Sequence, residues 1–156
     1  PKGSFYHYFK SKEAYGLALV DAYDDFFINK LKFYLEQSEV PALERIVHFT
    51  QSAIAGMQKY DYKRGCLVGN LNQELNHLSD DFKTRLMQSY IAWQQQLKRC
   101  LDLAQQQQTI NPHINTEQMS EYFWVGWEGA VMRAKLTQSS KPLTLYTEMF
   151  LRALLS

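Results

Sequence analysis

The chain has 156 residues, of which 46% are hydrophobic, 14% aromatic and 21% charged. It is too apolar for an intrinsically disordered chain and too interrupted by charge for a membrane span, which leaves a soluble globular protein of about one domain. Its net charge of +1 comes from 17 basic and 16 acidic residues, so binding to nucleic acid has to be sought in individual segments. Two cysteines and a start that lacks the features of a leader predict a reducing, cytoplasmic location.

The first residue is Pro1 instead of a methionine, and the residues behind it look like the middle of a motif, so we expect a chain shortened at its N-terminus. The stretch PKGSFYHYFKSKEA places Phe5 and Phe9 four residues apart, as buried anchors of a short helix surrounded by hydroxyls, rings and lysines. A second helix follows, with Ser11 and Lys12 at its start. Two helices in this order suit binding in the major groove of DNA. Side chains of the first helix can contact bases, and the backbone N–H groups at the start of the second can hold a phosphate. Packing in a core is the alternative for the tyrosines.

Apolar side chains recur at spacings of three and four along the rest of the chain, which is the period of one helix face. This pattern, with its caps and breaks, predicts helices over residues 11–37, 41–60, 65–78, 79 to the glutamine tract at 105–108, 116–138 and 143–155. Ser11, Ser79 and Thr116 are the expected N-caps of three of them. With only 7 glycines and 4 prolines, and no strand required, the predicted fold class is all-α.

The last two predicted helices carry more large apolar side chains than one packed stripe can bury. We therefore expect them to form a two-fold symmetric four-helix bundle with a second copy, in which Gly126 and Gly129 allow a close approach. Complete burial within one copy is the alternative. The residues expected at the dimer interface are Phe123, Trp124, Trp127, Val131, Tyr146, Met149 and Phe150.

Cys66 follows Lys63, Arg64 and Gly65 and lies in the first turn of a predicted helix. A helix start and neighbouring cations both favour a thiolate, so we expect the pKa of Cys66 to lie below the free value of about 8.5. Packing of a small apolar side chain under the helix start is the alternative. Cys100 lies near the middle of a long helix without free amides, and we interpret it as a half-buried packing residue.

The chain shows no recognisable catalytic or metal-binding pattern. Its four histidines, His7, His48, His77 and His113, lack the spacing of metal ligands. Glu74 with His77 matches half of a di-iron helix motif, but no other helix carries a second Glu-x-x-His. We expect neither an enzyme nor a cofactor or metal ion, and a helical enzyme or metal-binding bundle stays open as an alternative of another class.

The run GSFYHYFKSKE at residues 3–13 resembles the end of the helix-turn-helix of the tetracycline-repressor (TetR) family. The positions that match the family pattern are Gly3, Phe5, Tyr6, Phe9, Ser11, Lys12 and Glu13. A histidine frequent in the family falls on Tyr8, which keeps a ring with a polar tip. The resemblance implies a homodimeric repressor of operator DNA whose first two helices would precede Pro1. It implies base contacts from Lys2, Ser4, Tyr6, His7 and Tyr8, and a phosphate contact from Lys12.

By the same resemblance, residues 1–18 are the C-terminal part of the DNA-binding domain, and residues 19–156 are a helical effector-binding and dimerisation domain. An effector would favour a conformation in which the helix at 11–37 swings and changes the separation of the two recognition helices. No membrane partner is expected.

A narrower resemblance rests on the N-terminal run together with RGCLVGNLNQEL and LSDDF. These stretches are similar to the branch of the family that contains the N-ethylmaleimide-reductase repressor and senses electrophiles and oxidants through cysteine. It implies that Cys66 is the sensor and that Lys135 stabilises its sulfur or bonds to it after oxidation. A reversibly bound lipophilic effector is the alternative, in a pocket lined by Phe49, Tyr90, Trp93 and Phe123.

Overall fold

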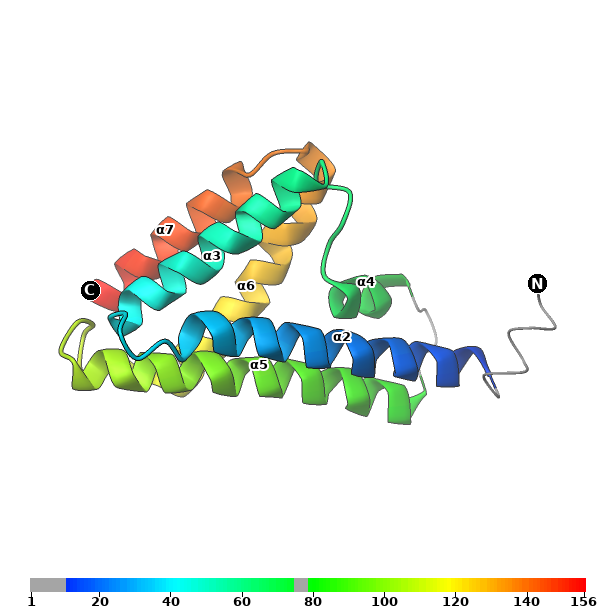
Figure 1. The fold of residues 1–156 in the computed structure, drawn as a ribbon, viewed down its shortest axis with the longest axis horizontal. Coiled ribbons are helices and arrows are strands. Elements are labelled where there is room, and N and C mark those ends of the chain that lie inside the picture. The colour runs from blue at the N-terminus through cyan, green and yellow to red at the C-terminus, as the bar shows by residue number, and fades with distance from the viewer. Residues whose placement is uncertain (1–10, 75–78) are drawn as a thin grey trace.

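The computed structural model describes residues 11–74 and 79–156. Within these residues every regular element is an α-helix, which confirms the predicted fold class. The helices are α2 (Lys12–Leu35), α3 (Ala42–Lys59), α4 (Leu67–Glu74), α5 (Asp80–Gln106), α6 (Thr116–Thr137) and α7 (Lys141–Leu155) (Figure 1).

The starts of the helices follow from local side-chain chemistry. The hydroxyls of Ser11 and Ser79 each accept a hydrogen bond of 3.1 Å from the backbone N–H three residues later, so both serines cap their helices as predicted. The prediction for α6 is wrong by one residue. Asn115 is its N-cap, and Thr116 already lies in the helix, where its hydroxyl donates to Asp102 of α5 at 2.5 Å.

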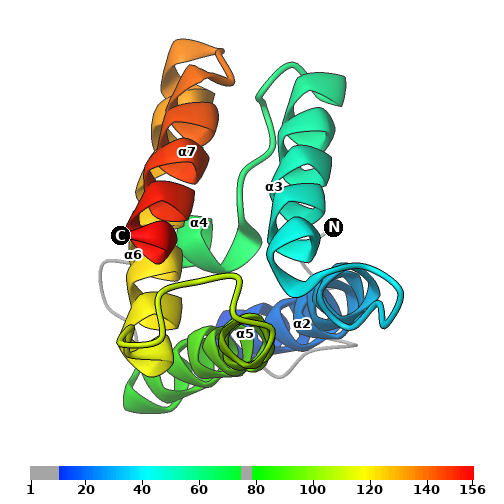
Figure 2. The same ribbon diagram turned by 90° about the vertical axis from the view of Figure 1, so that its left-hand side faces the viewer.

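The helices are arranged in two groups (Figures 1 and 2). α2 and α5 run side by side in the same direction. α6 and α7 form an antiparallel pair, and this pair and α3 lie on one side of α2 and α5. The short α4 contacts α2 and α5, and Figure 2 shows it between α3 and the α6–α7 pair. The segment that leads into α4 is therefore surrounded by side chains from several helices.

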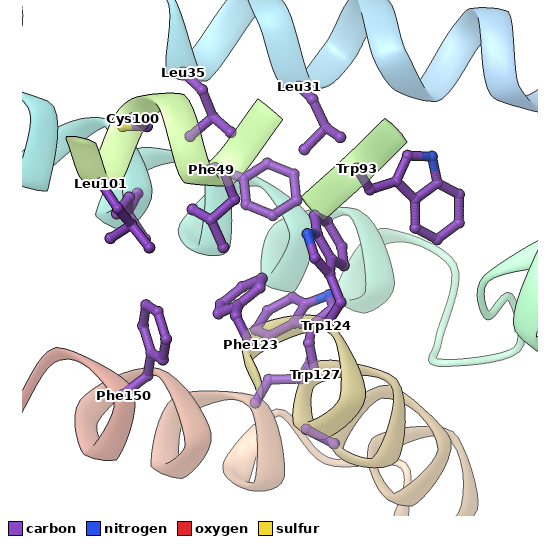
Figure 3. Close-up of a cluster of buried hydrophobic side chains, with 14 of the residues drawn as sticks. Leu31, Leu35, Phe49, Trp93, Cys100, Leu101, Phe123, Trp124, Trp127 and Phe150 are labelled. Atoms are coloured by element: carbon purple, nitrogen blue, oxygen red, sulfur yellow. The ribbon is translucent and has the colours of Figure 1, made fainter. Parts of the chain in front are cut away.

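Aromatic rings from α3, α5 and α6 build the centre of the core, with leucines of α2 beside them (Figure 3). Trp124 of α6 lies 5.4 Å from Trp93 of α5 and 6.0 Å from Phe49 of α3, between ring centres. Phe27 of α2 packs on the same Trp93 at 4.7 Å. Burying one apolar side chain of this size contributes about 2–3 kcal/mol, so this cluster fixes α6 against three other helices.

The burial of α6 corrects one prediction made from its sequence. Phe123, Trp124, Trp127 and Phe150 are at most 5% exposed within a single copy, so they need no partner chain to cover them. The reason is that α6 packs against both α5 and α7, which buries more than one stripe of the helix. These four residues therefore do not form an exposed dimer surface.

α2 passes through residues 18 and 19 without a break, so the expected boundary between a DNA-binding and an effector domain lies inside a continuous helix. Among the residues described, no helix combines the length and the apolarity that a membrane span requires.

Candidate functional site

Cys66 lies directly before α4, with its sulfur at the start of the helix. Its carbonyl oxygen accepts a hydrogen bond of 2.8 Å from the Asn70 N–H, which begins the helical pattern. The N–H groups of Val68 and Gly69 are directed at its sulfur. The expectation of a cysteine at a helix start is therefore confirmed.

Side chains from three helices surround this sulfur. Tyr23 of α2 hydrogen-bonds to Cys66, and Cys66 hydrogen-bonds to the carboxylate of Glu128 on α6. Tyr90 of α5 donates to Glu128 Oε2 at 2.9 Å. Burial raises the pKa of Glu128, against the effect of the hydrogen bonds from Tyr90 and Cys66. We call this connected group of Tyr23, Cys66, Tyr90 and Glu128 the Cys66 cluster.

A glycine on α4 makes room for the carboxylate. A Cβ atom on Gly69 would lie 3.0 Å from Oε2 of Glu128 and 3.7 Å from the Cβ of Cys66. Any side chain at this position would press on Oε2, the same oxygen that accepts the hydrogen bond from Tyr90. Gly69 thus allows α4 and α6 to bring the thiol and the carboxylate together.

The sulfur of Cys66 is held as a thiol. Burial raises the pKa of Cys66 to about 12, and the negative charge of Glu128 adds to the rise. The Gly69 N–H, the Tyr23 hydroxyl and the Val68 N–H act in the opposite direction without offsetting burial. The predicted lowering of this pKa is therefore wrong, because desolvation outweighs the helix start.

The cations beside Cys66 in the sequence are not among the groups that shift the pKa of its thiol. The guanidinium of Arg64 stacks on the ring of Tyr60, 3.8 Å from the ring centre, and Lys63 is exposed. The charged group that acts on the thiol is instead the carboxylate of Glu128, from a distant part of the chain.

A cavity of about 310 Å³ lies beside the Cys66 cluster, and its wall includes both Cys66 and Glu128. Lys30 and Arg64 contribute two cations to the wall. The volume falls within the usual range of small-molecule pockets, roughly 300–1,000 Å³. The large apolar side chains that line it are Phe26, Phe27, Met57, Trp93, Trp124 and Trp127.

A smaller cavity, of about 60 Å³, also has Cys66 in its wall, together with Glu128 and Lys135. The structure thus brings Lys135, which is itself exposed, to the same cavity as the cysteine with which the sequence pairs it. Val131, expected at a dimer interface, is half-buried and lines both cavities.

The four residues expected to line an effector pocket do not line one pocket. Trp93 lines the larger cavity. Tyr90 is not part of the cavity wall, but it donates a hydrogen bond to Glu128, which is. Phe49 and Phe123 lie in the buried core instead, because their faces of α3 and α6 pack on neighbouring aromatic rings.

Cys100 is a core residue, and its predicted packing role is confirmed. Its sulfur donates to the carbonyl oxygen of Ala42 at 3.3 Å, which joins α5 to the start of α3 (Figure 3). Burial raises the pKa of Cys100 to about 12. Neither of the two cavities described above includes Cys100 in its wall.

Of the Cys66 cluster, sequence reasoning missed Tyr23 as well as Glu128. Glu128 stands in the run FWVGWEGAVM, where it is the only charged residue. A lone carboxylate in an apolar helical stretch is costly to bury unless it has a partner, so its presence was a usable signal.

The residues expected to contact bases, Lys2, Ser4, Tyr6, His7 and Tyr8, lie outside the described residues. Lys12, expected to hold a phosphate, is the first residue of α2 and is exposed. Its side chain is therefore accessible at the positive end of that helix.

The exposed apolar surface of the last two helices consists of other residues than those expected. Met132 and Leu136 of α6 and Leu145 and Met149 of α7 are between 52% and 84% exposed. They line one groove, the α6–α7 groove, whose wall also includes the half-buried Tyr146. Of the expected interface residues, Met149 and Tyr146 thus belong to this surface.

The two glycines of α6 have different surroundings. A Cβ atom on Gly126 would collide with the ring of Tyr146 in the same copy, whereas nothing lies within 4 Å of one on Gly129. The close approach that Gly126 allows is therefore that of α7 in its own copy. Gly129 is the glycine that leaves open space in the α6–α7 groove.

Metal binding gains no support from the described part of the chain, in which no group of three or more His, Cys, Asp or Glu side chains is placed to hold an ion. His77, paired with Glu74 in the sequence, lies outside the described residues.

Comparison with known proteins gives one family and several relatives. Residues 42–150 match the family described as "Tetracyclin repressor-like, C-terminal domain". The transcriptional regulator AcuR of Cereibacter sphaeroides is 42% identical over 151 residues, which cover 96% of this chain and 68% of AcuR. The HTH-type transcriptional repressor NemR of Escherichia coli is 28% identical over 143 residues, which cover 92% of this chain and 72% of NemR.

Solved structures share the arrangement of these helices. A crystal structure of regulatory protein TetR from Rhodobacter sphaeroides superimposes with a TM-score of 0.92 at 41% identity, covering 97% of this chain and 80% of that one. The reduced form of Escherichia coli NemR superimposes with a TM-score of 0.84 at 26% identity, covering 100% of this chain and 80% of that one.

Proposed function

This chain belongs to the TetR family of transcriptional regulators, and we propose that it represses transcription as a homodimer that an effector releases from operator DNA. Because its relatives are transcriptional regulators, the chain is a regulator and not an enzyme. The observation that carries the proposal is the cavity of about 310 Å³ with the Cys66 thiol in its wall. The proposed activity belongs in the cytoplasm, where operator DNA is found.

DNA binding is assigned to residues 1–18, whose sequence supports it. Lys2, Ser4, Tyr6, His7 and Tyr8 would contact bases, and Lys12 would hold a phosphate. The exposed position of Lys12 at the start of α2 supports the phosphate contact, because free N–H groups and a positive dipole end lie there as well.

Dimerisation is assigned to the α6–α7 groove. Contiguous apolar side chains on a soluble protein mark an interaction surface, and Leu136, Leu145 and Met149 form such a surface here. The two-fold pairing of two such helices from each copy gives a four-helix bundle, which fixes the spacing of the two DNA-binding ends.

The effector is assigned to the cavity beside Cys66, and covalent modification of this thiol by an electrophile or oxidant is the proposed signal. The thiol lies in the wall of the larger cavity, where a small molecule can reach it. Lys135 lines the smaller cavity with Cys66, so its ammonium can stabilise a modified sulfur, or its neutral amine can bond to an oxidised one.

Reversible binding of a lipophilic compound is the second candidate, and a specific observation favours it. The indole N–H groups of Trp93 and Trp124 are buried without a hydrogen-bond acceptor, and both side chains line the cavity. Unpaired buried donors are rare, and the aromatic wall to which both indoles belong suits a lipophilic compound.

α2 connects the cavity to the proposed DNA contacts. Phe26, Phe27 and Lys30 of α2 line the cavity, and Lys12 begins the same helix, about 20–25 Å away. A ligand that shifts α2 would therefore change the separation of the recognition helices. To empty the operator almost completely, the effector must prefer the released state by about 5 kcal/mol.

The test uses the full-length protein bound to a fluorescent operator and treated with N-ethylmaleimide at pH 7. We expect a single adduct on Cys66 by mass spectrometry and loss of DNA binding. Cys100→Ser is the matched control, and it should form the Cys66 adduct and lose DNA binding as the wild type does. If N-ethylmaleimide still released DNA from Cys66→Ser, or labelled Cys100 faster than Cys66, covalent sensing at Cys66 would be contradicted. Reversible binding of a lipophilic effector would then be the better proposal.

A further inference from the structure

The proposed function leaves a chemical difficulty at Cys66. The nucleophilic form of cysteine is the thiolate, yet this sulfur keeps its proton because it is buried beside a carboxylate. We propose that Glu128 is the proton acceptor of Cys66, taking the S–H proton as the sulfur adds to an α,β-unsaturated carbonyl compound in the cavity. This inference rests on the proposed function, and it names the residue that makes a neutral thiol reactive.

The geometry places donor and acceptor together. Cys66 and Glu128 share the walls of both cavities, and a Cβ atom on Gly69 would lie 3.0 Å from Oε2 of Glu128 and 3.7 Å from the Cβ of Cys66, so the glycine is what permits their close approach. A general base has to lie within hydrogen-bond reach of the proton that it removes, and Glu128 fulfils this condition.

Hydrogen bonds also hold the carboxylate in position. Tyr90 donates to Oε2 of Glu128 at 2.9 Å from the neighbouring helix α5. Tyr23 hydrogen-bonds to the sulfur from α2, and its phenol accepts from the Leu67 N–H. The sulfur and the carboxylate are therefore held by contacts from α2 and α5.

Both groups are accessible to a ligand. Cys66 and Glu128 line the larger cavity, whose wall otherwise consists largely of aromatic rings. A flat conjugated carbonyl compound can stack on such a wall. The titratable and charged side chains around the thiol and its two cavities are Tyr23, Lys30, Tyr60, Arg64, Tyr90, Glu128 and Lys135.

The proposed step is a conjugate addition. The carboxylate of Glu128 accepts the proton of the thiol while a sulfur electron pair forms a bond to the β-carbon of the ligand. The C=C π pair moves to the carbonyl to give an enolate, which then takes a proton at the α-carbon from the Glu128 carboxyl. The net reaction adds S–H across the double bond, with no leaving group and no oxidant.

The experiment measures the rate of adduct formation by N-ethylmaleimide, itself an α,β-unsaturated carbonyl compound, from pH 5 to 9 in a Cys100→Ser background. Glu128→Gln keeps the size of the side chain and an acceptor for Tyr90 but removes the base. We expect its rate at pH 7 to fall about 100-fold, as is common when a general base is lost. Its rate should also rise with pH throughout, whereas the parent should level off once the carboxyl is ionised.

A Glu128 that hinders the reaction of Cys66 instead of assisting it would change the rate of Glu128→Gln in the opposite direction. If its charge only disfavoured the thiolate, Glu128→Gln would lower the pKa of Cys66 and react faster than the parent. An equal or faster rate would therefore overturn the proposal. Circular dichroism and thermal unfolding of each variant check that the fold is retained.

Tyr90→Phe gives a second test that does not depend on Glu128→Gln. The Tyr90 hydrogen bond lowers the pKa of Glu128, so its removal should raise that pKa and move the acid limb of the rate profile to higher pH. An unmoved acid limb would contradict the role of Glu128. The proposed function fails separately, if Cys66 in the parent protein forms no adduct or the adduct leaves DNA binding unchanged.

Discussion

Arg85 of α5 and Asp24 of α2 form an ion pair, with Nη2 of the arginine 2.8 Å from Oδ2 of the aspartate. The carboxylate is buried, and the hydroxyl of Ser89 donates to the same oxygen at 2.6 Å. Arg85 also donates to the exposed Asp21 at 2.7 Å. This pairing holds α2, which carries the proposed DNA contacts, against the helix that carries Trp93.

Arg85→Met should destabilise the protein strongly, because it leaves the buried Asp24 carboxylate without its counter-charge. Breaking a buried pair from one side commonly costs about 3–5 kcal/mol, and the lower end applies here since Ser89 remains. Urea denaturation at pH 7 measures the loss. Lys83→Met on the same helix is the control, because its pair with Asp80 is long and exposed, and it should change stability by under about 0.5 kcal/mol.

Gly126→Ala should destabilise each copy by about 1–3 kcal/mol, because the new methyl group would collide with the Tyr146 ring. The ring has little freedom to move, since its hydroxyl donates to the carbonyl oxygens of Tyr122 and Phe123 at 2.8 and 2.9 Å. Thermal unfolding reports the change.

Gly129→Ala is the matched control on the same helix. It meets open space and should stabilise α6 by up to about 1 kcal/mol. Equal effects of the two substitutions would show that the Tyr146 contact does not limit the packing of α6 on α7.

Alkaline pH should destabilise the protein in part through Cys66. Its folded pKa of about 12 lies above the unfolded value of about 8.5, so the stability it contributes is complete below pH 8.5 and is lost as pH rises towards 12. Between these values the unfolded chain binds fewer protons, which lowers the free energy of unfolding by up to about 1.4 kcal/mol per pH unit.

Cys66→Ser removes this titration, so the free energy of unfolding from urea titrations between pH 8 and 10.5 should fall less steeply than in the wild type. Parallel curves would mean that the thiol titrates at its ordinary pKa. A wild-type protein that instead gained stability relative to Cys66→Ser between pH 6 and 8.5 would indicate a lowered pKa.

Leu145→Glu should convert the proposed dimer to a monomer, because it places a charge in the α6–α7 groove. Light scattering during gel filtration at micromolar concentration gives the mass. Phe33→Glu, at a side chain of similar exposure on α2, is the control and should remain dimeric. A wild-type protein that elutes as a monomer would refute the assignment of this face.

Lys12→Ala in the full-length protein should weaken binding to specific and non-specific DNA alike. Loss of one phosphate contact should reduce the slope of log K against log salt by about 1. Lys32→Ala serves as the control, because that lysine is exposed in the last turn of the same helix. An unchanged slope for Lys12→Ala would exclude the phosphate contact.

The sequence by itself determined the helices, the N-caps of two of them and the family. Helix formation depends on side chains three and four residues apart and on capping groups next to the helix ends, and both are legible in the sequence. For the same reason the position of Cys66 at a helix start, with N–H groups directed at its sulfur, could be predicted. Its placement with Lys135 came from resemblance, and the structure brings both to one cavity.

Only the tertiary structure decided the protonation of Cys66 and the exposed face of the last two helices. The pKa of a thiol depends on all groups around it in space, and here burial and the distant Glu128 outweigh the local helix start. Likewise, a helical wheel shows that α6 is apolar, but packing against α5 and α7 is what buries Trp124 and leaves Leu136 exposed. Desolvation and burial are sums over spatial neighbours, which the order of residues along the chain does not specify.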